Sequence, residues 1–411
     1  MRITIIGAGI IGATVAHELL DQGHDVVLID PEEPGSGASR GNAGWIAHLD
    51  ILPLASPKAW HNMPRWMLDP LGPLSIRPAY LPRLAPYLLR FLLASRAGAR
   101  AAGTQAIIAL NGLALPAWER RLAALGLSDH LRRRGLLSVW SRPADFAAAQ
   151  PVIEAQKALG IAVELFDGAG VRRLEPAFGP VVVGGAWYPA GCHVADPRDL
   201  TVAIASAAVQ RGATLIRAKV ESLDATAEGV RLTLAGVPRE AADLVVIAAG
   251  AWSRPLASDV GDAVPLDTER GYNITLARGT LGLERPVMFE GEGMVTSPLD
   301  SGDRIGGAVE FAGLDAPANM ARVDAMLARL RRFLPGFTDG VVGERWMGCR
   351  PSIPDSLPVI GRSARHANVI HAFGHGHYGL TQAAATAELV GAMVAGQAAP
   401  IDPAPFAVTR F

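Results

Sequence analysis

The sequence predicts an α/β protein with two domains, on the basis of three observations. The chain has 411 residues, which is roughly two to three times the length of a typical domain. It opens with a strand, a glycine-rich turn, a helix and a second strand, the repeating unit of a Rossmann-like fold. Residues 262–311 instead alternate short strands with hairpin turns, which is typical of a mostly antiparallel sheet.

Composition limits the classes of function. Half of the residues are hydrophobic, 19% are charged, and 38 Lys and Arg residues nearly balance 39 Asp and Glu residues. Such a chain is neither disordered nor an electrostatic binder of nucleic acid, so we expect a small-molecule partner. Cys192 and Cys349 lie far apart without metal-binding spacing, which argues against disulfides and a zinc site. We therefore expect no metal and a reducing, cytoplasmic compartment.

The N-terminal unit is the strongest local motif. Ile3–Ile6 is a β-branched run, the glycine-rich turn spans 7–12, and a helix-like stretch continues through Leu20. Val26–Ile29 supplies a second strand, and Asp30 lies at its end. The apolar run of residues 1–12 is short, contains glycines and leads into this helix, so we expect neither a signal peptide nor a membrane span there.

Each special residue of this unit has a physical role in binding a dinucleotide. Gly7 allows the tight turn, Gly9 lets the backbone approach a pyrophosphate, and Gly12 lets the helix pack closely on the strand. Asp30 can accept hydrogen bonds from ribose hydroxyls, and its charge disfavours a 2′-phosphate. The motif does not distinguish NAD from FAD.

A second α/β region follows a long insertion. Asp196 is the predicted N-cap of a helix that Gly212 ends. A strand at 213–217, hairpin strands within 218–234 and a buried strand at 243–249 come next. The insertion, from residue 51 to about 190, holds several amphipathic helices and a strand near Leu136–Trp140, and we interpret it as part of a cap. A further amphipathic helix is predicted at 321–333.

The last seventy residues contain a second glycine-rich turn. A strand at 368–373 leads into the turn at 374–381, and an alanine-rich helix covers 382–395. The free N–H groups at such a helix start favour a negatively charged ligand, such as a reduced flavin, although a structural loop is an equal alternative.

With these segments in place, the chain resembles the D-amino acid oxidase/dehydrogenase superfamily of FAD enzymes, which includes glycine and sarcosine oxidases. Five stretches in order carry the resemblance: GAGIIGATVAHEL at the N-terminus, SGASRGNAG at 36–44, VVIAAGAWS at 245–253, RPSIPDSLPVIG at 350–361 and GHGHYGLTQAAATAELV at 374–390. Within the superfamily the chain is most similar to bacterial D-amino acid dehydrogenases. The resemblance implies a discontinuous FAD-binding domain from 1–50, 193–261 and 345–411, and a substrate (cap) domain from 51–192 and 262–344.

The resemblance also implies which residues hold noncovalent FAD. Cys349 stands one residue closer to the Pro-Asp pair than in the sarcosine oxidases that attach flavin covalently. The implied FAD-binding residues are Gly7, Gly9, Ile10, Ile11, Gly12, Asp30, Ser39, Arg40, Asn42, Ala43, Gly44, Val220, Ala249, Gly250, Trp252, Gly361, Gly376, His377, Gly379, Leu380 and Thr381.

For the substrate, the resemblance points first to Arg350. An arginine at this motif position anchors the substrate carboxylate, and its planar fork matches that anion; the alternative is an ion pair with Asp355. Tyr272 could donate to the same carboxylate or be a packed core residue. His48 and His377 could contact the substrate, although a lone loop histidine is more often structural. A metal site at His375 and His377 would lack a third ligand.

The implied reaction is oxidative deamination of a D-amino acid to a 2-oxo acid and ammonia. Hydride passes from Cα to flavin N5, and the electrons then go to a quinone or another acceptor, such as a redox protein. The apolar stretch 81–93 with its two arginines is a cap helix or a peripheral contact with the inner face of the cell membrane. Rival interpretations are oxidation of a secondary amino acid (D-proline, hydroxy-D-proline, sarcosine) or glycine, a flavin subunit of a hetero-oligomeric dehydrogenase, and an NAD-dependent dehydrogenase.

Overall fold

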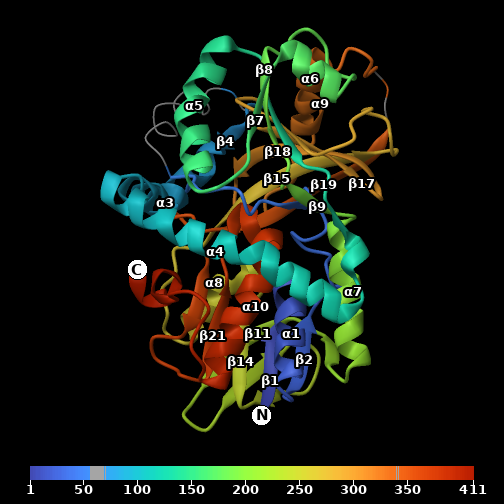
Figure 1. Ribbon diagram of the computed structural model, residues 1–411. Helices are drawn as coiled ribbons and strands as arrows, with labels where there is room; N and C mark the ends of the chain where they lie inside the picture. Colours follow the sequence, from blue (N-terminus) through green and yellow to red (C-terminus); the bar gives the residue numbers. More distant parts are fainter. Residues whose placement is uncertain (56–68, 70, 339, 341) are drawn as a thin grey trace.

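The computed structural model describes residues 1–55, 69, 71–338, 340 and 342–411, and residues 56–68, 70, 339 and 341 of the expected cap lie outside this description. Two large sheets, each covered by helices, lie one above the other in Figure 1. The sheet near the N-terminus belongs to the Rossmann-like domain, and the other forms the cap. The fold is therefore α/β, with a mostly antiparallel sheet in the cap.

The Rossmann-like sheet has six strands in the order β10-β2-β1-β14-β21-β20. All neighbours pair in parallel except β20, which is antiparallel to β21. Its strands are β1 (Arg2–Ile6), β2 (Asp25–Asp30), β10 (Thr214–Arg217), β14 (Leu244–Ile247), β20 (Val359–Arg362) and β21 (Val369–Phe373). The central strands are continuously apolar because both faces of the sheet are covered.

Helices cover one face of this sheet and a small sheet covers the other. The helices are α1 (Ile10–Asp21), α4 (Ala97–Leu125), α7 (Pro197–Gln210) and α10 (Gly379–Ala395). Opposite them lie β11 (Val220–Ala225), β12 (Val230–Leu234), β13 (Glu240–Ala242) and α8 (Ser253–Asp259). The predicted cap of α7 is confirmed, since Asp196 Oδ1 accepts hydrogen bonds from the N–H groups of Arg198 (2.7 Å) and Asp199 (3.1 Å).

The cap sheet has the strand order β19-β15-β18-β17-β16-β6-β8-β7, and β4 pairs with β18 beside this path. Its strands are β4 (Leu74–Ile76), β6 (Leu136–Trp140), β7 (Glu164–Asp167), β8 (Gly184–Tyr188), β15 (Asp267–Leu276), β16 (Val287–Phe289), β17 (Met294–Leu299), β18 (Gly302–Phe311) and β19 (Gly343–Ser352). The helices around it are α3 (Leu81–Ala94), α5 (Pro143–Ala158), α6 (Gly168–Leu174) and α9 (Ala321–Phe333). The predicted helix at 321–333 is confirmed, and Val323, Met326 and Leu330 bury one face of it.

Two elements cross the domain boundaries expected from the sequence. Helix α4 lies in the range assigned to the cap, yet it packs on α10, and Trp118 Nε1 donates to the Leu380 carbonyl at 2.9 Å. Figure 1 shows α4 running across the molecule between the two sheets. Strand β19 begins before the expected boundary at 344/345 and pairs along its whole length with β15 of the cap. The positions of α4 and β19 depend on contacts with elements distant in the sequence, and local sequence pattern does not predict such contacts.

A third, small sheet joins the two parts of the molecule. It consists of β3 (Trp45–Ile46), β9 (Cys192–Val194) and β5 (Leu131–Arg132), in the order β3-β9-β5. The carboxyl ends of β1, β2, β14 and β21 point toward the boundary with the cap, where Rossmann-like folds bind ligands. Among the described residues, no helix combines the length and apolarity needed to cross a lipid bilayer.

Candidate active site

A cavity of about 1140 Å³ lies between the Rossmann-like domain and the cap. The carboxyl ends of the parallel strands line one side, and β15, β17, β18 and β19 of the cap sheet line the other. This volume exceeds the usual range for a drug-sized ligand, so the cavity has room for a dinucleotide together with a small substrate.

The first glycine-rich turn leaves no room for side chains. Gly7 has φ +110°, and a Cβ atom there would lie 2.4 Å from the Ala248 carbonyl oxygen. A Cβ atom on Gly12 would lie 1.9 Å from the Gly7 carbonyl oxygen. These contacts bring the start of α1 directly against the ends of β1 and β14, with Gly9, Ile10 and Ile11 facing the cavity. Backbone N–H groups at such a helix start are suited to a pyrophosphate.

Two polar side chains hold this turn in place. Ser39 Oγ accepts a hydrogen bond from the Ile10 N–H at 3.0 Å. The Asp30 carboxylate accepts from the N–H groups of Ala8 (2.7 Å) and Glu32 (2.9 Å) and lines the cavity at the end of β2. Burial raises the pKa of Asp30, although both N–H donors favour its charged form. Each oxygen keeps a second lone pair for a ribose hydroxyl.

Most of the FAD-binding residues expected from the sequence line the cavity. They are Gly7, Gly9, Ile10, Ile11, Asp30, Ser39, Asn42, Ala43, Val220, Ala249, Gly250, Trp252, Gly376, His377, Gly379 and Leu380. Gly12, Gly44 and Gly361 lie behind this lining, where Gly12 packs on Gly7 and Gly44 packs on Leu299.

Three further predicted residues point their side chains at other protein groups. Arg40 forms an ion pair with Glu344 on the surface, although its carbonyl accepts from Arg304. Thr381 Oγ1 accepts from the Ala47 N–H at 2.9 Å, which fixes the segment after β3 against the start of α10. His48 Nδ1 bonds the Ile46 carbonyl at 2.9 Å and is not part of the cavity lining, as the structural alternative for this histidine predicts.

Arg350 faces the cavity from β19. Its guanidinium lies over the backbone of Gly271 on β15, where a Cβ atom would come within 2.3 Å of Cζ. Nη1 is buried and has no hydrogen-bond partner among the described residues. Asp355, the alternative partner considered from the sequence, is bound by Arg410 Nε at 2.9 Å instead. Burial lowers the pKa of Arg350 and the carboxylate of Glu269 raises it, so the guanidinium has a charged neighbour but keeps one free donor arm.

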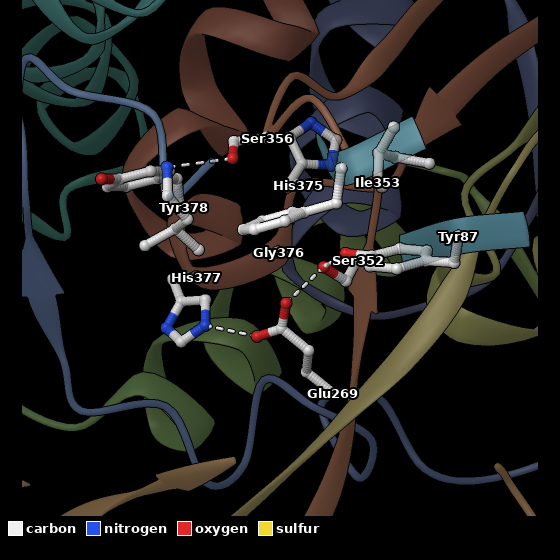
Figure 2. A pocket seen from close by; sticks show the side chains of 12 residues that line it. Tyr87, Glu269, Ser352, Ile353, Ser356, His375, Gly376, His377 and Tyr378 are labelled. Atoms are coloured by element: carbon white, nitrogen blue, oxygen red, sulfur yellow. Dashed lines mark hydrogen bonds and ion pairs between the residues drawn. The ribbon is translucent and has the colours of Figure 1, made fainter. Parts of the chain in front are cut away.

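A chain of hydrogen bonds runs beside Arg350 and is drawn in Figure 2. His377 Nε2 and Glu269 Oε2 are 2.7 Å apart, and Ser352 Oγ donates to Glu269 Oε1 at 2.5 Å. The Tyr87 hydroxyl of α3 lies 2.8 Å from Ser352 Oγ. Burial acts to raise the pKa of Glu269, but His377, Ser352 and Arg350 outweigh it, and the pKa is lowered. Glu269 is therefore an ionised group that hydrogen-bonds His377 and lies close enough to Arg350 for the two charges to interact.

Tyr272 does not present its hydroxyl as the substrate prediction requires. The hydroxyl donates to Glu310 Oε2 at 2.5 Å and accepts from the Asn319 N–H at 3.2 Å, and the residue is 1% exposed. Its one hydroxyl hydrogen is thus used inside the cap, because Glu310 lies in a buried cluster of arginines. This placement favours the packed-core alternative.

The other reactive side chains near the cavity are structural. His375 Nε2 bonds Thr386 Oγ1 at 2.9 Å, and burial lowers the pKa of this histidine to about 3, so it is neutral. Within the described chain, no three His, Cys, Asp or Glu side chains gather as metal ligands would. Burial raises the pKa of the Cys349 thiol, which faces the cavity.

Sequence reasoning missed several residues that line the cavity. Glu269 lines a small pocket beside the cavity and stands in the sequence among other polar residues, Asp267, Thr268 and Arg270, so no signal marked it. Asp50 lies in a loop without a motif, and no sequence signal marked it. The Trp346 side chain lies where Cβ atoms on Gly41 and Gly348 would stand, at 2.0 and 1.8 Å. The two glycines therefore make room for this indole at the cavity wall.

Comparisons with known proteins agree along the whole chain. The family described as FAD dependent oxidoreductase (DAO) matches residues 2–393. A D-amino-acid oxidase of Bradyrhizobium diazoefficiens is 36% identical, with 100% of this chain and 99% of the relative covered. A D-amino acid dehydrogenase of Rhizobium rhizogenes is 28% identical over the full length of both chains.

Solved structures show the same fold at low sequence identity. Glycine oxidase from Geobacillus kaustophilus superimposes with a TM-score of 0.78 at 23% identity, covering 100% of this chain and 99% of its own. L-proline dehydrogenase from P. horikoshii gives a TM-score of 0.77 at 18% identity, covering 100% and 97%.

Proposed function

Because the chain belongs to the DAO family of FAD-dependent oxidoreductases, we propose that it is a D-amino acid dehydrogenase whose substrate carboxylate binds Arg350. The protein is a FAD-dependent enzyme that oxidises amino acids, as its relatives do. The observation that carries the finer proposal is that Arg350 lines the cavity and that its buried Nη1 has no hydrogen-bond partner among the described residues.

The cavity fits FAD without covalent attachment. Because Gly7 and Gly12 carry no side chains, a pyrophosphate can approach the backbone of this turn closely. Asp30 lies where it can bind a ribose hydroxyl. Gly376, Gly379 and Leu380 line the far end, at the start of α10, where the isoalloxazine would lie. When bound, FAD supplies the acceptor for two electrons and a proton from the Cα–H bond.

The residues of this chain orient the substrate for that step. Arg350 would hold the carboxylate by two parallel N–H···O bonds, and the nearby carboxylate of Glu269 favours the charged guanidinium. The amine reacts in its deprotonated form. Water then hydrolyses the imino acid to a 2-oxo acid and ammonia, and the protein need supply no acid or base for that step.

Removal of the guanidinium tests this assignment. Arg350→Ala should weaken substrate binding by about 2–5 kcal/mol, because it removes one partner of a desolvated charge pair. The measurement is the substrate concentration dependence of anaerobic flavin reduction, with bound FAD quantified from the visible spectrum. Unchanged kinetics would mean that the carboxylate docks elsewhere, and a colourless protein that takes up no added FAD would exclude this cavity as the flavin site.

The substrate class has a specific rival. Structural neighbours include a glycine oxidase and an L-proline dehydrogenase, so oxidation of glycine, sarcosine, D-proline or hydroxy-D-proline is the second candidate. Anaerobic flavin bleaching with a panel of primary D-amino acids and these compounds ranks the two. Bleaching by the second group alone would reject a D-amino acid dehydrogenase.

Dye reduction by the purified single chain in the presence of substrate would exclude the need for a partner subunit.

The electron acceptor is proposed to be a membrane quinone, reached by peripheral binding at the inner face of the cell membrane. Helix α3 exposes Leu89, Leu92 and Leu93, and residues 71–118 contain five arginines and no Asp or Glu. This combination suits an anionic lipid surface. Sedimentation with anionic and with neutral vesicles tests it. Replacement of all three leucines by serine should abolish sedimentation with anionic vesicles, and unchanged sedimentation would reject this surface.

A further inference from the structure

We propose that Asp50 selects the side chain of the substrate, and that the enzyme prefers D-amino acids with a positively charged side chain. The inference rests on the proposed function, in which Arg350 holds the carboxylate. Arg350 and Asp50, which carry opposite charges, line the same cavity. We assign the carboxylate of Asp50 to the end of the substrate side chain.

Asp50 is held in place by buried polar groups. Asn111 of α4 is 1% exposed, and its Nδ2 donates to the carbonyl of Asp50 at 2.8 Å. Gln382 of α10 donates in turn to Asn111 Oδ1 at 3.0 Å. Two helices therefore fix the backbone of this loop. Asp50 is exposed to the open space of the cavity that it lines, and protein surrounds this cavity.

The charge of this carboxylate is not matched by any described residue. Its partner is the hydroxyl of Tyr378, and no Lys, Arg or His side chain of the described chain forms an ion pair with it. Burial and the nearby carboxylate of Glu290 raise the pKa of Asp50 to about 6. A carboxylate in such surroundings is stabilised by a cation, and the cavity is where a cation can enter.

Asp50 and Arg350 address different parts of the ligand. The pKa of Arg350 responds to burial and Glu269, whereas the pKa of Asp50 responds to burial, Glu290 and Tyr378, so the two groups have different neighbours. Glu290 directly follows β16, which is four strands from β19 in the cap sheet. The α-amine of a bound substrate is attached to the carbon that carries the carboxylate, so it stays near Arg350, whereas the side chain extends away from both. The side chain is therefore the part that Asp50 meets.

The wall between the two charges suits an aliphatic stem. Gly306 and Gly307 of β18 offer bare backbone to the cavity that Asp50 and Arg350 line, and Met288 and Met294 add apolar surface to it. A Cβ atom on Gly307 would lie 2.1 Å from the Gly293 carbonyl oxygen, so this stretch stays free of side chains. Arginine and lysine combine such a stem with a terminal cation.

The test compares charged and neutral substrates of similar length in the holoenzyme. The ratio of kcat/KM for D-arginine and D-lysine to that for D-norleucine and D-methionine should exceed 1 in the wild type. The ratio should fall roughly 30-fold or more in Asp50→Asn, since one partner of a buried charge pair is neutralised. Asp50→Glu, which keeps the charge, should restore part of the ratio. Asp25→Asn, an exposed change at the start of β2, should keep the wild-type ratio.

A binding measurement separates this inference from the proposed function. Butylguanidinium, a side-chain fragment, is titrated into the holoenzyme and followed by the change in flavin absorbance. Affinity that is at least 10-fold weaker in Asp50→Asn supports the cation site, even if no D-amino acid bleaches the flavin and the proposed function fails. Equal ratios and equal fragment affinities in the wild type and Asp50→Asn would overturn the inference, while bleaching by neutral D-amino acids would leave the proposed function standing.

Discussion

Arg350 owes its position to the absence of a side chain on its neighbour. The guanidinium lies directly on Gly271, so the site depends on one glycine in the middle of a cap strand. The family resemblance predicted Arg350 as an anchor, but the motif contained no sign that Gly271 makes room for it. The same is true of Glu269, because its contacts with His377 and Ser352 come from segments more than eighty residues away.

Substitution of Gly271 tests this dependence. Gly271→Ala should displace the guanidinium, because a Cβ atom would come within 2.3 Å of Cζ, and the substrate KM should rise by at least roughly 10-fold. FAD content from the visible spectrum should stay at the wild-type level. Gly112→Ala in α4, where a Cβ atom meets nothing within 4 Å, is the control. If Gly271→Ala keeps the wild-type KM, substrate binding does not depend on the position of the Arg350 guanidinium over Gly271.

The raised pKa of Asp50 predicts a pH dependence of substrate preference. The groups that face its carboxylate are Tyr378, Glu290 and Tyr188, and burial with Glu290 sets the pKa at about 6. The carboxylate is neutral below this pH and charged above it, so the preference for D-arginine over D-norleucine should grow as pH rises through about 6. Ratios of kcat/KM from pH 5 to 8 measure this. If the kcat/KM ratio in Asp50→Asn changes with pH at the same midpoint as in the wild type, a group other than Asp50 causes the pH dependence.

At the scale of elements, motif and periodicity predicted most of the Rossmann-like core. The N-terminal unit, α7 with its Asp196 cap, and α9 are confirmed. The C-terminal helix begins at Gly379, before the predicted 382, because the turn at Gly376–Tyr378 leads directly into it. The packing of α4 and the pairing of β19 could not be predicted, since both depend on partners distant in sequence.

The hydrogen-bond chain from Tyr87 to His377 joins α3, β19, β15 and the turn before α10. Ser352→Ala would remove the donor to Glu269 and the hydroxyl that hydrogen-bonds the buried Tyr87 hydroxyl. We expect the free energy of unfolding to fall by about 1–3 kcal/mol, the usual cost of an unsatisfied buried polar group. Denaturant unfolding measures it, with Ser258→Ala, at an exposed serine of α8, as control. Equal losses in both variants would argue against a structural role for the chain.

At the scale of the whole molecule, the cavity combines the ends of one sheet with the face of another. The part of the cavity suited to a dinucleotide is formed by a local motif, so it could be predicted from the sequence alone. Its substrate half depends on how the cap sheet lies over β1 and α10, which no short segment encodes. Thus Asp50 and Trp346 became visible only when the two domains were seen together.

Buried histidines predict how stability depends on pH. Burial lowers the pKa of His193 to about 4 and that of His375 to about 3, below the 6.5 of an unfolded chain. Between these values the unfolded state binds more protons, so each histidine reduces stability as pH falls below about 6.5. At pH 5 the loss is about 2 kcal/mol for each. Urea unfolding at pH 7 and 5 measures it; His193→Gln should show a smaller loss, and an equal loss would contradict the assignment.

The order of strands in the Rossmann-like sheet has a consequence for biosynthesis. Strand β1 leaves the ribosome first, yet one of its two neighbours, β14, is translated more than two hundred residues later, and α10 later still. Until then the part of α1 that packs on α10 has no partner, so a nascent chain stalled before α10 would expose it to chaperones and proteases. Flavin capture should accordingly be a late, post-translational event.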